Sequence, residues 1–100
     1  MASVETLKER IANAESAIEK KGNTIEKKQN LIAKKMVESV AHPEKERWLS
    51  YDIEHLNEDI KRLMKEREEK REALKRYKEE LSKLEGVKRD IPSLVEFLNG

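Results

Sequence analysis

The sequence predicts an all-α protein: a long antiparallel two-helix coiled-coil hairpin with a short third helix at its C-terminal end. Two apolar stripes with 3-4 spacing, one in each half of the chain, predict two long helices that pair along a seam. A proline at position 43 lies between the stripes, where the first turn of a new helix tolerates it. Charged residues make up 43 % of the chain and apolar residues 36 %. That composition suits one narrow seam rather than a multilayered core.

The first helix is predicted for residues of about 4–40, with Ser3 at the N-cap position. Its stripe consists of Val4, Leu7, Ile11, Ala14, Ile18, Gly22, Ile25, Gln29, Ile32, Met36 and Val40. Gly22 interrupts this stripe, but Ile18 and Ile25 stay in phase across it. Glycine inside a helix costs about 1 kcal/mol relative to alanine, so we expect one continuous helix. A helix stop at Gly22 followed by a new cap is the alternative.

The second helix is predicted for residues of about 43–85, after a tight turn at residues 40–43. Its stripe consists of Leu49, Ile53, Leu56, Ile60, Leu63, Arg67, Lys70, Leu74, Tyr77, Leu81 and Leu84. Apolar residues fill every position except Arg67 and Lys70. Gly86 follows the stripe and is predicted to take the left-handed conformation that often ends a helix.

The two stripes match when the chain folds back near residue 42, because facing positions then have a nearly constant sum of residue numbers. The facing pairs include Val4 with Leu81, Ile11 with Leu74, Ile18 with Arg67, Ile25 with Ile60, and Ile32 with Ile53. Arg67 and Lys70 fall at one weak layer, where their aliphatic stems can line the seam. Glu15 and Glu19 are within reach of them for ion pairing. We interpret the layer as a register-fixing device and regard a binding role as the weaker alternative.

Residues 87–100 are predicted to form a linker and a short apolar helix, separate from the hairpin of residues 1–86. The apolar residues of this candidate docking arm are Leu94, Val95, Phe97 and Leu98. A helix of about two turns is unstable alone, so the arm is expected to dock on another surface. A homodimer that forms a helical bundle would provide one.

Several apolar or aromatic residues fall beside the seams and form a candidate partner-binding patch near the turn. Its members are Trp48, Tyr51, His55, Leu31 and Val37. Exposed aromatic patches mark interaction sites more often than the average surface does. The alternative, equally compatible with the sequence, is that Trp48 folds over the turn and covers Val37 and Val40.

Three lysine doublets recur every seven residues in the first helix and form a candidate basic strip. The strip consists of Lys20, Lys21, Lys27, Lys28, Lys34 and Lys35. It could contact the phosphates of a nucleic acid. The second helix places acids, among them Asp52 and Asp59, opposite these lysines, so neutralisation within the chain is the favoured interpretation.

Other chemistry is not indicated. The net charge of +1 gives no overall bias toward nucleic acid or anionic membranes, and the chain has no cysteine. Asp52, His55 and Glu58 have a spacing that could chelate one metal ion, but the carboxylate-bridged bundles need this motif twice. We therefore predict no metal, no cofactor, no small-molecule substrate and no enzyme activity. The first ten residues lack the apolar core of a signal peptide, and no apolar run approaches membrane-spanning length. A cytoplasmic location and no membrane association are therefore expected.

The segments RWLSYDIEHLNEDIKRL and RDIPSLVEFLN, with the charged heptad helix between them, resemble uncharacterised small coiled-coil proteins of phages and integrative elements of Gram-positive bacteria. The resemblance implies a mobile-element accessory protein and carries no active-site residues. From the residues themselves we expect a non-enzymatic interaction or assembly module that binds itself or another protein. The alternative is a nucleic-acid-associated or anti-defence inhibitor, by analogy with anti-CRISPR proteins, that uses the basic strip.

Overall fold

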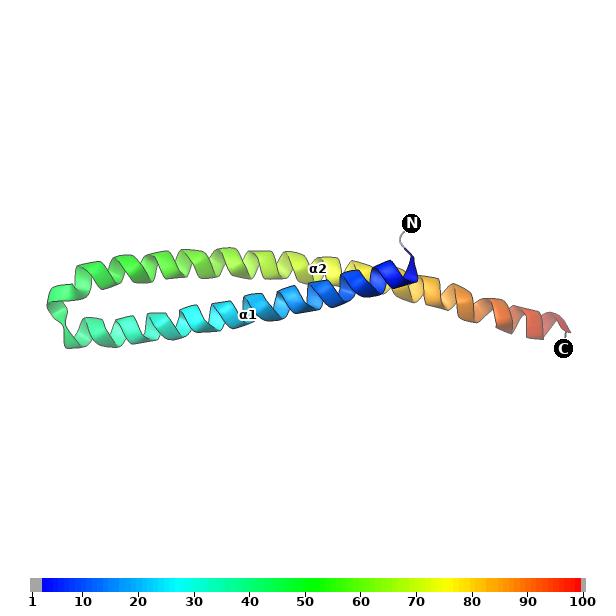
Figure 1. The fold of residues 1–100 in the computed structure, drawn as a ribbon, viewed down its shortest axis with the longest axis horizontal. Helices are drawn as coiled ribbons and strands as arrows, with labels where there is room; N and C mark the ends of the chain where they lie inside the picture. The colour runs from blue at the N-terminus through cyan, green and yellow to red at the C-terminus, as the bar shows by residue number, and fades with distance from the viewer. Residues whose placement is uncertain (1–2, 100) are drawn as a thin grey trace.

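A computed structural model describes the backbone of residues 3–99 and the side-chain surroundings of residues 3–86. Three helical elements follow one another along the chain: α1 (Val4–Ala41), the 3-10 turn η1 (Pro43–Lys45) and α2 (Glu46–Asn99). The two long helices run antiparallel and are joined at one end by η1 (Figure 1). The principal extents are 83 × 22 × 15 Å. The predicted helical hairpin is confirmed.

The ends of α1 are held by local hydrogen bonds. Ser3 Oγ accepts a hydrogen bond from the Thr6 backbone N–H at 3.1 Å, which confirms Ser3 as the N-cap. At the other end the His42 backbone N–H donates to the Glu38 carbonyl oxygen at 2.8 Å. Pro43 then begins η1, where its missing N–H is not needed. The chain therefore reverses over a very short segment, as the position of Pro43 predicts.

Gly22 lies inside α1 without ending it, so the prediction of one continuous helix is confirmed. A Cβ atom added at Gly22 would lie 3.8 Å from Arg67 Nη1, an ordinary van der Waals distance. The guanidinium of α2 therefore lies against the bare backbone of α1 at this level. The two residues form what we call the Gly22–Arg67 layer.

The core is a single file of side chains between α1 and α2. The buried residues among those described are Leu7, Ala14, Ile25, Ile32, Leu49 and Ile60. Ile25, Ile32 and Ile60 form one buried cluster, which we call the isoleucine cluster, and the partly buried Ile53, Leu56 and Leu63 pack against it. Residues predicted to face one another therefore meet at this level, and burial of their apolar surface holds the hairpin together.

The predicted end of the second helix was wrong. α2 passes through Gly86 and continues to Asn99, so the linker and separate short helix predicted for residues 87–100 are not observed. Gly86 does not take a positive φ angle, because glycine permits the left-handed conformation without imposing it. Figure 1 shows the last part of α2 running beyond the start of α1. The side chains of the candidate docking arm, Leu94, Val95, Phe97 and Leu98, lie outside the described ones.

Candidate protein-interaction surface

The two aromatic residues nearest the turn project into solvent. The first turns of α2 place Trp48 and Tyr51 three residues apart on one side of the helix, away from the buried Leu49. Trp48 is 75 % exposed and Tyr51 is 61 % exposed. Together with Arg47 they line a surface hollow of 470 Å³. A tryptophan left this exposed at the end of a rod is available to a partner.

A second hollow adjoins this aromatic pair. The Tyr51 and His55 rings meet edge to face, with 4.3 Å between their centroids and 65° between their planes. His55 in turn lines a groove of 250 Å³ together with Leu31, which is 43 % exposed, and Leu56. Two hollows and one ring contact therefore place Leu31, Trp48, Tyr51 and His55 along one side of the hairpin end. We call these four residues the tip patch.

Val37, predicted as a fifth member, belongs to another side of the tip. It lies six residues after Leu31, which is about 120° around the helix axis. Val37 is 70 % exposed and Val40 is 83 % exposed, so Trp48 does not cover them. The alternative interpretation, in which Trp48 folds over the turn, is wrong. Arg47 was missed by sequence reasoning, although a cation beside the only tryptophan could have indicated it.

Half of the lysine strip is neutralised by α2. Lys21 pairs with Glu66 at 2.7 Å, Lys28 with Asp59 at 3.3 Å and Lys35 with Asp52 at 3.2 Å. These three ion pairs recur every seven residues on both helices, and we call them the ion-pair ladder. Lys20, Lys27 and Lys34 point outward, and within residues 3–86 they form no ion pair. The strip therefore consists of one row of lysines that pair with acids of α2 and one row of lysines that point outward.

The ion pair nearest the open end of the hairpin, Lys21–Glu66, changes the pKa of its glutamate. The Lys21 ammonium donates a hydrogen bond to Glu66 Oε2 at 2.7 Å. This hydrogen bond and the positive charge of Lys21 lower the pKa of Glu66 below its ordinary value of 4.5, with a smaller contribution from Arg62. Glu66 therefore stays ionised to more acidic pH than a free glutamate.

The weak layer of the seam differs from the predicted arrangement. Arg67 Nε is buried and has no hydrogen-bond partner. Glu15, expected near Arg67 and Lys70, instead lies 3.6 Å from Lys78. The Arg67 guanidinium packs over Gly22, so its contact is with backbone rather than with a carboxylate.

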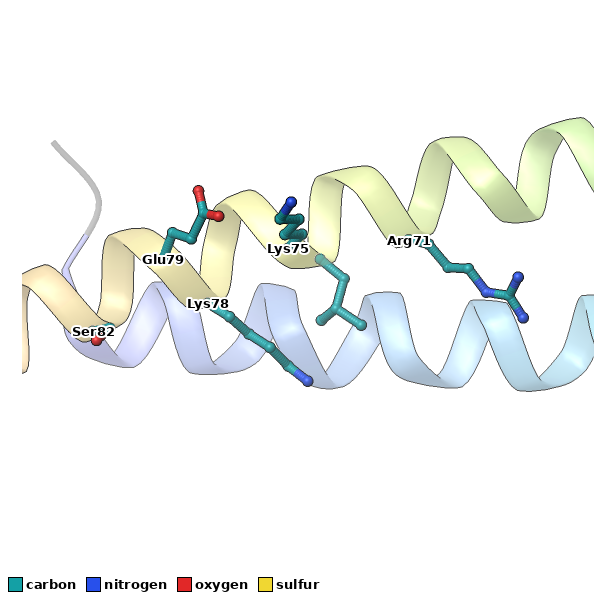
Figure 2. Close-up of a pocket in the computed structure, with 6 residues that line it drawn as sticks. Arg71, Lys75, Lys78, Glu79 and Ser82 are labelled. Carbon is teal, nitrogen blue, oxygen red and sulfur yellow. The ribbon is translucent and has the colours of Figure 1, made fainter.

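A further hollow of 380 Å³ lies along α2, and Figure 2 shows its lining side chains. Its residues are Arg71, Leu74, Lys75, Lys78, Glu79 and Ser82. Lys75 and Glu79 point to one side of α2, whereas Lys78 reaches across α1 (Figure 2). Because the polar groups diverge, this hollow lacks the convergent groups of a binding or catalytic site.

Neither a metal cluster nor a membrane span occurs in the described part of the chain. No three His, Asp or Glu side chains there lie close enough to hold a metal ion. Asp52, one of the candidate ligands, is paired with Lys35. In the same residues no helix has the length and apolar character needed to cross a bilayer.

Comparison with protein families, with curated proteins and with solved structures finds no match to this chain.

Proposed function

We propose that this protein is a non-enzymatic interaction or assembly module, a helical rod that binds another protein through its turn end. The observation that carries the proposal is the exposure of two large aromatic side chains near the turn, Trp48 at 75 % and Tyr51 at 61 %. Tryptophan and tyrosine are the residue types most enriched among binding hot spots. The ion-pair ladder and the isoleucine cluster hold the two helices that display them. The paired helices thus hold the tip patch in place, and the tip patch contacts the partner protein.

The proposed partner is a protein: a second copy that gives a homodimeric helical bundle, or a different protein. The resemblance to small proteins of phages and integrative elements supports a host or phage protein as that different partner. The proposed location is the cytoplasm of a bacterial cell. The proposal assigns no catalytic residue, no cofactor and no small-molecule substrate.

Capture with the immobilised full chain tests this function. We expect a Trp48→Ala, Tyr51→Ala double variant to lose at least tenfold of the affinity for any partner that the unmodified chain binds, because both anchors are removed. Val37→Ala is the matched control, since Val37 is an equally exposed apolar residue on a different side of the tip. Equal losses with both variants, or no loss with either, would contradict a function at the tip patch.

A second candidate function uses the outer lysines. Lys20, Lys27 and Lys34 are exposed, form no ion pair within residues 3–86, and repeat at about 10.5 Å along α1. They could contact the phosphates of a duplex, either alone or in a nuclease–guide complex. The test measures binding to a duplex and to a nuclease–guide complex at several salt concentrations. It compares the unmodified chain with a variant in which Lys20, Lys27 and Lys34 are changed to glutamate. Binding that survives these three changes would exclude the outer lysines as the contact.

A further inference from the structure

Every polar side-chain group around the hollow beside Trp48 can donate a hydrogen bond. The hollow is lined by Arg47, Trp48 and Tyr51. A guanidinium and an indole N–H only donate, whereas a phenol hydroxyl donates or accepts. Arg47 is exposed and forms no ion pair within residues 3–86. A ligand that fits this hollow therefore offers acceptors, and a carboxylate or another anion suits it best.

Two more free cations lie beside the apolar residue that α1 contributes to the tip patch. Lys27 is four residues before Leu31 and Lys34 is three residues after it, so the two lysines flank Leu31 by one turn on either side. Both lysines are exposed, and neither forms an ion pair in the part of the chain whose side chains are described. Unpaired positive charge therefore borders the tip patch along α1 and beside the hollow of Arg47.

The acids of this side are either paired or lie along α2. The two aspartates that line the groove beside Leu31 pair with lysines of the ion-pair ladder. Glu54 and Glu58 are exposed and form no ion pair among the described side chains. They follow Tyr51 and His55 by one turn of α2. The surface is thus positive on its α1 edge and negative on its α2 edge, so a partner must carry its charges at particular positions.

From these observations we infer that the tip patch and Arg47 bind an acidic segment of a different protein, in which carboxylates flank a bulky apolar side chain. The inference rests on the proposed interaction function and names the chemistry of its partner. The apolar side chain fills the hollow beside Trp48 and Tyr51, whose 470 Å³ is a volume typical of ligand sites. One carboxylate pairs with the planar fork of Arg47, and another reaches Lys34 beside Leu31.

A nucleic acid fits the same surface less well. Its backbone carries a negative charge at every nucleotide, so it would also run past Glu54 and Glu58. A peptide bears carboxylates only at some positions and can leave the α2 edge free of them. The groove next to the hollow has aliphatic walls in Leu31 and Leu56. These walls suit an apolar side chain better than a base, since bases stack on aromatic rings and guanidinium planes.

Selection from a random peptide library against the immobilised full chain tests the chemistry of the partner. Peptides that also bind the Trp48→Ala, Tyr51→Ala variant are removed first, so the retained peptides depend on the tip patch. The inference predicts that they are enriched in aspartate and glutamate next to leucine, phenylalanine or tyrosine. Trp48 is the only tryptophan of the chain. A retained peptide without tryptophan should therefore shift the Trp48 emission to shorter wavelength, because the indole leaves water.

Charge reversal provides the decisive comparison. Arg47→Glu combined with Lys34→Glu should raise the dissociation constant of the acidic peptide by about tenfold or more. Lys61→Glu combined with Lys65→Glu changes the net charge equally and is the matched control, expected to stay within about twofold. Lys61 and Lys65 are exposed, form no ion pair in the described part of the chain, and lie about 15–21 Å beyond Tyr51 along α2.

Two further measurements complete the comparison. A copy of the peptide with lysine in place of each acid should bind the reversed variant more tightly than it binds the unmodified chain. Circular dichroism checks that all variants remain helical, since the four substituted positions are exposed.

Four outcomes overturn the inference. Retained peptides without acidic enrichment, or equal losses in the two charge variants, exclude an acidic partner, although such tip-dependent binding would still support the proposed function. A single-stranded oligonucleotide that shifts Trp48 emission at lower concentration than the acidic peptide makes a nucleic acid the occupant. If the emission shifts with the concentration of the chain alone while its mass doubles in sedimentation, a second copy is the occupant. A library that yields no tip-dependent peptide also overturns the inference, and the capture experiment then decides the proposed function.

Discussion

The isoleucine cluster and the Gly22–Arg67 layer occupy neighbouring levels of the same seam but hold it in different ways. In the cluster, Ile25 and Ile60 are 3 % and 7 % exposed and pack against other apolar side chains. In the layer, the bare backbone of Gly22 faces a guanidinium whose Nε has no partner. The cluster therefore supplies stability, whereas the layer costs stability, and a polar group in a seam can still help to select one register. Three changes separate these roles, and a fourth tests the Lys21–Glu66 ion pair of the ladder.

The largest effect is expected in the isoleucine cluster. Ile60→Ala removes buried methyl groups and leaves a cavity between two helices that cannot close fully, so the free energy of unfolding should fall by about 2–5 kcal/mol. Urea unfolding followed by circular dichroism, at one fixed protein concentration, measures the change. Asn57→Ala, an exposed position one turn earlier, is the control and should stay within about 0.5 kcal/mol. Equal effects of both changes would mean that the cluster does not carry the seam.

In the Gly22–Arg67 layer, a substitution is expected to raise the free energy of unfolding rather than lower it. Arg67→Leu replaces a buried, unsatisfied donor by an apolar side chain that suits the seam, so the free energy of unfolding should rise by about 1–3 kcal/mol. The same urea experiment applies, with Arg71→Leu, an exposed arginine one turn later, as the control. A loss of stability on Arg67→Leu, larger than any change in the control, would show that the arginine makes a net favourable contact over Gly22.

A smaller gain is expected at Gly22. Gly22→Ala improves helix propensity by about 1 kcal/mol, and the added Cβ fits at 3.8 Å from Arg67 Nη1. Gly86→Ala is a matched control, because that glycine is also helical and an added Cβ there meets nothing within 4 Å. Similar gains for both variants indicate that the layer has room for a methyl group. A gain at Gly86 with a loss at Gly22 would show that Arg67 needs the bare backbone.

The smallest effect is expected on the stability of the fold at acidic pH. The folded protein lowers the pKa of Glu66, so this carboxylate stabilises the fold above its ordinary pKa of 4.5, and the contribution is lost as the pH falls through the lower folded value. We expect the thermal midpoint to drop as the pH falls below 4.5, and to drop less in Glu66→Gln. Glu58→Gln changes an exposed glutamate that forms no ion pair within residues 3–86, and should keep the full drop. Identical pH profiles for all three proteins would exclude the Lys21–Glu66 rung as the source.

Much of the fold could be predicted because it depends on periodicity. The spacing of apolar residues indicated both long helices, and Pro43 indicated the turn between them. Facing residues such as Ile25 and Ile60 could be paired by number, since antiparallel helices advance equally per residue. Gly22 was predicted to stay helical for the same reason, because the stripe keeps its phase across it.

The candidate site was predicted less well, because side-chain direction around each helix matters there. Trp48, Tyr51, His55 and Leu31 could be named as residues off the seam, but Val37 could not be separated from them by composition alone. Each lysine doublet looked uniform, yet one member lies toward the acids of α2 and the other points to water. Gly86 was misjudged because a glycine is compatible with both a helix end and a helix interior.

By itself, the sequence determined an all-helical hairpin, its turn and its register, because heptad spacing and a proline act locally and repeat along the chain. Only the tertiary structure decided which charges are paired, what Arg67 packs against, and which exposed apolar residues share one surface. Those features depend on where side chains meet across two helices. That geometry varies over a few ångströms, and no spacing within a single helix encodes it.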